Sequence, residues 1–191
     1  ANSCTIVTVI SLMASMVEYS KVIETGWQAL FRQHIHIKRG KSASAAVCLV
    51  LGSDQGMCGQ FNDAIVQFAI KEVISLKAKG IQSRCWTAGE RIRPGMDEEI
   101  SIDQYFLLPS SIDAISDMTV TIVQEFAALH ETQHIDMLLL YYNSLGRRGM
   151  YEPVALQVLP FDRKWSLQHK KAIWPSRCLT IVGMGLDAFF E

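Results

Sequence analysis

The stretch that most constrains the fold runs from residue 45 to residue 62 and reads Ala-Ala-Val-Cys-Leu-Val-Leu-Gly-Ser-Asp-Gln-Gly-Met-Cys-Gly-Gln-Phe-Asn. Residues 45–51 form a continuous apolar run, too short for a buried helix, that suits a strand buried on both faces. A glycine-rich turn follows, and Asn62 is expected to cap a helix because its side chain can accept a free backbone N–H. The stretch predicts a strand, a tight turn and a helix, which together open an α/β unit.

The hydrophobic patterns farther along the chain continue this alternation of strands and helices. Pro94 is expected to stop a short helical turn, and the last two strands are expected to pair as a hairpin because their connection is short. Further strands are predicted at 81–87, 98–107, 135–142 and 154–159, and a helix is predicted at 62–79. These elements predict a three-layer, Rossmann-like α/β domain with a mostly parallel sheet.

A second long helix is predicted to begin after Ser110, which precedes Asp113 at capping-box spacing. Its expected buried stripe consists of Ile112, Ile115, Thr119, Ile122, Phe126 and Leu129. This helix would cover the sheet before the closing hairpin.

The N-terminal region, residues 5–37, carries an apolar stripe with helical spacing. A helix of that length measures roughly 45–50 Å at ~1.5 Å per residue, more than one small sheet can cover. It is either a core helix with a frayed end or a helix that leaves the domain and needs another partner. The residues assigned to its shaft-like stripe are Leu12, Met13, Met16, Tyr19 and Ile23.

Composition narrows the class of protein. A length of 191 residues suits one domain, and 49% hydrophobic against 19% charged residues excludes intrinsic disorder. The net charge of −1 gives no electrostatic reason to expect nucleic-acid binding. No apolar stretch reaches transmembrane length. The five cysteines show no CxxC spacing, which favours reduced, buried thiols in a cytosolic protein.

The glycine turn could indicate a nucleotide- or small-molecule-binding α/β domain. Its spacing, Gly52-x-x-x-Gly56-x-x-Gly59, differs from GxGxxG, and no Gly-Lys-Ser/Thr follows. Asp54 inside the turn would also repel an anion. The alternative interpretation is a tight turn whose glycines connect a strand to a closely following helix.

Residues 130–134 read His-Glu-Thr-Gln-His and match the HExxH pattern of zinc hydrolases. That chemistry needs His130 and His134 on one helical face, with Glu131 activating a zinc-bound water. The helical stripe fades before His134, so we expect His134 to lie past the helix end on a different heading. We therefore interpret the pattern as a chance match and expect neither a metal nor a cofactor.

Ser-Asp-Gln-Gly-Met-Cys-Gly-Gln-Phe-Asn at 53–62 resembles the Ser-Asp-Arg-Gly-Leu-Cys-Gly-Gly-x-Asn signature of the γ subunit of F-type ATP synthases. Gly89-Glu90-Arg91, the Asp-x-x-x-x-x-Tyr-Asn stretch at 136–143, and Leu159-Pro160 resemble further family features in the same order. Gln55 replaces a basic residue and Gln60 a glycine, which fits a divergent branch. The long C-terminal helix of the family is absent, so the chain resembles a γ fragment.

This resemblance implies a non-catalytic rotor subunit that couples ion translocation to ATP synthesis, with no ATPase activity of its own. It implies a partial shaft helix at 1–40, a globular domain at 41–186 and the start of a C-terminal helix at 187–191. The loop implied to contact the catalytic ring comprises Asp54, Gln55, Gly56, Met57, Cys58 and Gly59.

The implied partners are the α and β subunits of the catalytic ring, an ε-type subunit and the c-subunit ring. The resemblance also implies a peripheral position on the cytoplasmic face of a prokaryotic cell membrane, with membrane contact only through the complex.

Overall fold

The structure is a computed structural model of the 191-residue chain. It describes residues 21–26, 28–29, 32, 44–54, 60–109, 111, 113–145, 151–160, 167 and 174. The chain divides into two compact units, one of residues 39–160 and one of residues 1–38 with 161–191. None of the described helices is both long and apolar enough to cross a bilayer.

In the second unit, residues 21–26, 28–29 and 32 are helical, in agreement with the predicted N-terminal helix. Ile23 lies in this helix and is 44% exposed. The other stripe residues, Leu12, Met13, Met16 and Tyr19, lie outside the described residues, as does the predicted helix start at 187–191.

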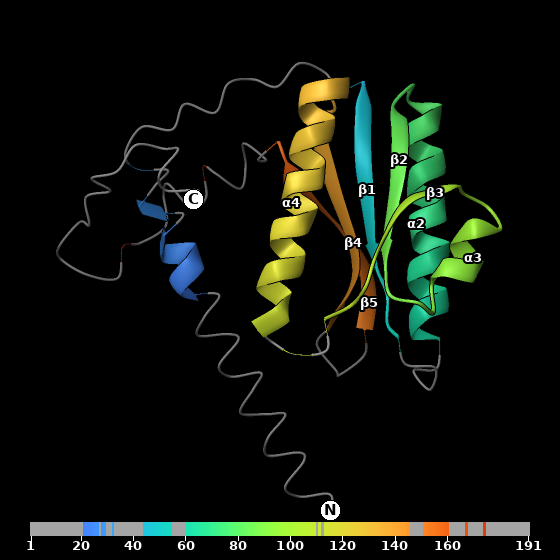
Figure 1. The fold of residues 1–191 in the computed structure, drawn as a ribbon, viewed down its shortest axis with the longest axis horizontal. Helices are drawn as coiled ribbons and strands as arrows, with labels where there is room; N and C mark the ends of the chain where they lie inside the picture. Colours follow the sequence, from blue (N-terminus) through green and yellow to red (C-terminus); the bar gives the residue numbers. More distant parts are fainter. Residues whose placement is uncertain are drawn as a thin grey trace, which may run out of the picture. The chain divides into compact units, whose positions relative to one another are not determined.

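The first unit is built on a five-stranded sheet with the order β3-β2-β1-β4-β5 (Figure 1). The four strands β3, β2, β1 and β4 run parallel, and β5 pairs antiparallel with β4 as the predicted hairpin. The strands are β1 (Ala45–Leu51), β2 (Gln82–Ala88), β3 (Ile102–Phe106), β4 (Met137–Leu145) and β5 (Tyr151–Leu159). The mostly parallel sheet predicted from the sequence is confirmed.

Helices cover both faces of this sheet, so the predicted three-layer architecture is also confirmed. The helices are α2 (Phe61–Ala78), α3 (Arg93–Asp97) and α4 (Asp113–Gln133). In Figure 1, α2 lies on one side of the strands and α4 on the other. Parallel strands need such crossover helices to return the chain to the same end of the sheet.

The central strand β1 explains why the core has two halves. Cys48 and Val50 point toward α2 and belong to one buried cluster, whereas Val47 and Leu49 belong to the cluster beneath α4. All four side chains are buried, as expected for a strand with a continuous apolar run. Because β1 is packed on both faces, the position of its carboxyl end is set by the core.

Two local predictions about helix ends are wrong. The helix α2 begins at Phe61 with Gln60 at its N-cap position, so Asn62 lies inside its first turn and does not cap it. Pro94 does not stop a helical turn but sits in the first turn of α3, where its missing N–H costs no helical hydrogen bond.

The predicted stripe of α4 is correct in its C-terminal half only. Ile122 and Phe126 are buried and Leu129 packs against the same cluster. Ile115 and Thr119 are exposed, whereas Met118 packs against the same cluster. Ser110 and Ile112 lie outside the described residues. The hydroxyl oxygen of Ser111 accepts the Ala114 N–H at 3.4 Å at this end of the helix.

Candidate functional site at the carboxyl end of the sheet

The loops that follow β1 and β2 meet at the carboxyl end of the parallel strands. Because all parallel strands end at the same edge, this edge is where α/β folds commonly bind their ligands and partners. Gly52 donates its N–H to the Ala88 carbonyl oxygen at 2.8 Å, and Arg91 donates its N–H to the Ser53 carbonyl oxygen at 3.0 Å. The two loops thus continue the strand pairing past the sheet.

Glycine is required where these two loops touch. Gly89 has a φ of +109°, and a Cβ placed there would lie 2.8 Å from the backbone carbon of Gly52. A Cβ on Gly52 would lie 2.3 Å from a methyl carbon of Ile92, whose side chain is fully buried. The close approach therefore depends on the missing side chains as well as on backbone conformation.

Asp54 links the loop after β1 to the loop after β2 through both its side chain and its backbone. Its Oδ1 accepts the Glu90 N–H at 2.8 Å. Its carbonyl oxygen accepts a hydrogen bond from Nε of Arg91 at 3.4 Å. Asp54 is the last described residue before the loop 55–59, so these contacts fix the point where that loop leaves the sheet.

The end of the loop 55–59 is anchored by residues in the first turn of α2. Oδ1 of Asn62 accepts the Ser53 N–H at 3.0 Å, and Nδ2 of Asn62 donates to the Ser53 hydroxyl at 3.0 Å. From β4, Nδ2 of Asn143 donates to the Phe61 carbonyl oxygen at 2.8 Å. The side chain that was expected to cap the helix instead joins the two ends of the loop.

The predicted loop residues Gln55, Gly56, Met57, Cys58 and Gly59 lie outside the described residues, whereas Asp54 is described. What the structure shows is the frame that holds them. The described residues at both ends, Asp54 and Asn62, are hydrogen-bonded to neighbouring segments.

The rim beside this frame carries charges of both signs. Burial, followed by a hydrogen bond to the Glu90 carboxylate, raises the pKa of Tyr105 to about 12, so its hydroxyl remains a donor at neutral pH. The guanidinium of Arg93 lies 5.3 Å from the centre of the Tyr105 ring and 3.8 Å from the Asp97 carboxylate. This mixture suits contact with a polar protein surface better than capture of an anion.

The same geometry argues against a nucleotide site at these loops. Such a site needs free backbone N–H groups that point at phosphate oxygens. Here the N–H groups of Ser53 and Glu90 are already bonded to the side chains of Asn62 and Asp54.

The HExxH pattern does not form a zinc site in this arrangement. The helix α4 ends at Gln133, and His134 has a φ of +55°, so His134 lies past the helix end and does not continue the helical face that carries His130. Nδ1 of His130 lies 3.1 Å from both the Ile135 carbonyl oxygen and an Asp136 carboxylate oxygen. The predicted placement of His134 is confirmed, and Glu131 is exposed on the last turn.

Within the described part of the chain, no three His, Cys, Asp or Glu residues gather so as to hold a metal ion. Cys48 and Cys85 are buried free thiols on neighbouring strands. Burial raises the pKa of Cys48 to about 11 and that of Cys85 to about 12, which leaves both protonated and unreactive at neutral pH. These two cysteines agree with the predicted reduced, buried thiols.

A first prediction follows from the geometry of His130 and His134. The chain purified without added metal is expected to contain no stoichiometric zinc by elemental mass spectrometry, because the two histidines do not converge. One tightly bound zinc per chain that disappears in His134→Ala would contradict both this expectation and the interpretation of the HExxH pattern as a chance match.

Comparison with known proteins identifies the family. The sequence model of a protein family described as ATP synthase matches residues 6–178. An ATP synthase gamma chain from Buchnera aphidicola subsp. Schlechtendalia chinensis is 23% identical over 143 residues, which cover 74% of this chain and 49% of that protein. This chain belongs to the ATP synthase γ-chain family. An ATP synthase gamma chain from Rickettsia bellii (strain RML369-C) is 26% identical over 121 residues, which cover 62% of this chain and 41% of that protein.

The chain thus spans about half the length of the curated γ chains that it matches. Among solved structures, a chain of the central stalk and c-ring of Tetrahymena thermophila mitochondrial ATP synthase has a TM-score of 0.54 at 15% identity, covering 90% of this chain and 80% of that one. A chain of the Euglena gracilis mitochondrial ATP synthase rotor has a TM-score of 0.50 at 12% identity, covering 80% and 60%. At such identities the likeness is one of fold.

Three of the four motifs through which the sequence resembles the γ family come together in space. Ser53, Asp54 and Asn62 from the first motif contact one another or the Glu90-Arg91 turn of the second, and Asn143 from the third contacts the start of α2. Leu159-Pro160 lies at the other end of the sheet, where the antiparallel β5 finishes. Three γ-family motifs therefore build a single frame around the loop 55–59.

Sequence reasoning missed two residues of this site. Tyr105 falls in the strand predicted at 98–107, and its link to Glu90 has no local signal in the sequence. Asn143 was noted as part of a family motif without a role. Its place directly after the strand predicted at 135–142 is a signal that could have pointed to the carboxyl edge.

Proposed function

We propose that this chain is a non-catalytic γ subunit in the rotor of an F-type ATP synthase, where it couples ion translocation to ATP synthesis or hydrolysis. The observation that carries the proposal is the match of the ATP synthase family over residues 6–178. The fold adds support, since it is shared with a chain of a solved ATP synthase central stalk.

In this proposal the N-terminal helix is part of the shaft, with Leu12, Met13, Met16, Tyr19 and Ile23 on its contact stripe. Residues 1–40 form the partial shaft, 41–186 the globular domain and 187–191 the beginning of a second shaft helix. An asymmetric shaft can favour a different conformation of each catalytic subunit as it turns. That differential stabilisation transmits rotation to the nucleotide sites.

The proposed partners are the α and β subunits of the catalytic ring, an ε-type subunit and the ring of c subunits. The complex context is supported by the central-stalk and rotor assemblies whose chains share this fold. Bacterial relatives favour a prokaryotic source. We propose a peripheral position on the cytoplasmic face of the cell membrane, with membrane contact made through the complex.

The loop from Asp54 to Gly59 is the proposed contact with the catalytic ring. The frame of hydrogen bonds around Asp54 and Asn62 supports this role, because a loop that must press on a moving partner needs fixed ends. The mixed charges on the rim, Glu90 and Arg91 among them, are suited to a polar protein partner.

The test is a double substitution in the assembled enzyme, within a chain that carries the remaining γ sequence. Gln55→Ala with Met57→Ala is expected to alter ATP turnover or its coupling to ion flow. The same pair is expected to leave the melting temperature of the isolated chain nearly unchanged, as surface substitutions usually do. Turnover is measured by phosphate release, and coupling is measured by ion uptake into vesicles.

Lys79→Gln provides the matched control, since Lys79 is an exposed residue at the far end of α2. Coupling that stays at the wild-type level in the double variant would remove the contact role of the loop. ATP hydrolysis by the purified chain alone would overturn the rotor assignment itself.

A further inference from the structure

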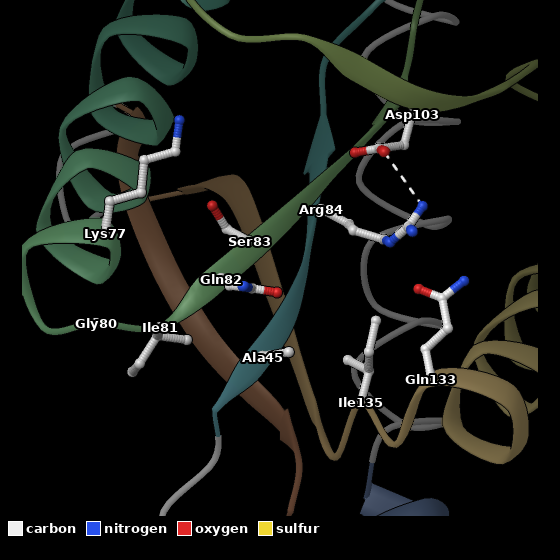
Figure 2. Close-up of a pocket in the computed structure, with 10 residues that line it drawn as sticks. All are labelled: Ala45, Lys77, Gly80, Ile81, Gln82, Ser83, Arg84, Asp103, Gln133 and Ile135. Atoms are coloured by element: carbon white, nitrogen blue, oxygen red, sulfur yellow. Dashed lines mark hydrogen bonds and ion pairs between the residues drawn. The ribbon is translucent and has the colours of Figure 1, made fainter.

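A hollow of about 570 Å³ lies at the opposite end of the sheet, around the first residues of β2. Figure 2 shows that Lys77 enters it from α2 on one side of β2, while Gln133 and Ile135 come from the end of α4 and the segment before β4. The remaining lining residues are Ala45, Gly80, Ile81, Gln82, Ser83, Arg84 and Asp103. None of these residues belongs to the frame around the loop 55–59.

The hollow exists because β3 stops short of the beginning of β2. Pairing between the two strands starts at Cys85 with Ile102 and then shifts, so that Trp86 pairs with Gln104. Asp103 is therefore the extra residue of a β-bulge. Its carboxylate folds back over the edge of β2, where Oδ2 accepts the Cys85 N–H at 2.8 Å and Oδ1 lies 3.3 Å from Arg84.

Ser83 is left with an unpaired strand edge. Gln82 donates its N–H toward β1, to the Ser44 carbonyl oxygen at 2.9 Å. Because successive N–H groups along a strand alternate in direction, the N–H of Ser83 points the other way, as that of Cys85 does. No described strand pairs with Ser83 on that side. The Ser83 hydroxyl is also buried without a hydrogen-bond partner in the described part of the chain.

The side chains around this edge carry a net positive charge. Arg84 and Asp103 form an ion pair, so their charges offset one another. Lys77 forms no ion pair with any described residue, and its ammonium group lies on the same side of β2 as the Ser83 side chain in Figure 2. Gln133 adds a neutral amide from the other side of the strand.

We propose that this hollow binds an extended peptide segment carrying a carboxylate side chain. The segment adds to the edge of β2 in line with β3, exchanging backbone hydrogen bonds with Ser83, and its carboxylate pairs with Lys77. Strand addition of this kind takes affinity from main-chain bonds and selectivity from the side chains beside the edge. The unpaired peptide groups select an extended backbone, and the net positive charge selects the acidic side chain.

The probe is a seven-residue, terminally blocked peptide of alternating valine and glutamate, titrated against the 191-residue chain by calorimetry. We expect saturable binding, slower hydrogen exchange at the Ser83 amide, and dissociation constants about tenfold larger for Lys77→Gln. The exposed Lys79→Gln lies outside the hollow and is expected to bind as the wild type does. A valine and lysine peptide is expected not to bind.

The proposed backbone hydrogen bonds are tested by removing an N–H donor first from the protein and then from the peptide. Ser83→Pro removes the N–H that points into the hollow together with the Ser83 hydroxyl, at a position of β2 that no described strand pairs on that side, so that proline meets the condition under which strands tolerate it. The melting temperature of this variant checks its fold. A probe with N-methyl groups on alternate residues removes the donor from the peptide instead and leaves the protein intact. Both changes are expected to abolish binding.

Each of the following outcomes would overturn the inference. They are the absence of saturable binding to the wild type, equal binding of the lysine peptide, unchanged binding by the N-methylated peptide, and unchanged exchange at Ser83 when the probe is bound. Free glutamate or inorganic phosphate competing as well as the peptide would show that the hollow binds an anion without strand addition. None of these results bears on the proposed rotor function.

Discussion

Replacing Gly89 by alanine is expected to lower the free energy of unfolding by about 3–5 kcal/mol, because two penalties act at one position. A φ of +109° strains any residue with a Cβ, and the new methyl group would lie 2.8 Å from the backbone carbon of Gly52. Neither backbone segment can move away cheaply, since each continues a buried strand. The loop after β1 would be displaced together with Asp54.

Gly80→Ala is the matched control for this substitution. Gly80 also has a positive φ, +77°, but a Cβ there would meet nothing within 4 Å. Its expected cost is about 1 kcal/mol, the conformational penalty alone. Guanidinium unfolding of both variants measures the difference. Equal losses would show that the close approach of the two loops contributes nothing to stability.

Phe126→Ala is expected to cost about 3–5 kcal/mol, the usual loss for a large aromatic side chain removed from a packed core. Phe126 is 7% exposed and belongs to the cluster beneath α4 that also contains Trp86 and Phe106. The cavity left behind would lie between α4 and the sheet, where neighbouring side chains can collapse only in part.

Val123→Ala on the same helix provides the comparison, because Val123 is 56% exposed. It is expected to change stability by less than about 0.5 kcal/mol. Thermal and denaturant unfolding of the two variants would separate the inner from the outer face of α4. Similar losses at the two positions would contradict the placement of this helix.

The alternation of strands and helices could be predicted because each buried element has a recognisable local sequence pattern. The apolar run of β1 indicates burial on both faces, and the short link between β4 and β5 indicates a hairpin. The stripe of α4 was only half predictable. Ile115 has the spacing of a core residue yet is exposed, because hydrophobic periodicity gives the orientation of a helix and not the extent of the surface that it covers.

Part of the candidate site could also be predicted. The glycine turn, Asp54 and Asn62 were singled out from the sequence, and the end of α4 before His134 was expected from the fading stripe. The role of Asn62 could not be predicted, because a side chain near a helix start can serve either its own helix or a neighbouring loop. Which one it serves depends on where the Ser53 N–H lies in space.

The sequence by itself determined the order of strands and helices, the two-sided burial of β1, and the glycines that make a tight turn possible. Only the tertiary structure decided that the turns after β1 and β2 touch, that Asp54 bonds to Glu90, and that β3 leaves Ser83 unpaired. The physical reason is the distance along the chain over which each kind of interaction acts. Hydrophobic pattern and turn chemistry act between residues close in the chain, whereas these contacts join segments far apart in sequence that meet only when the sheet has formed.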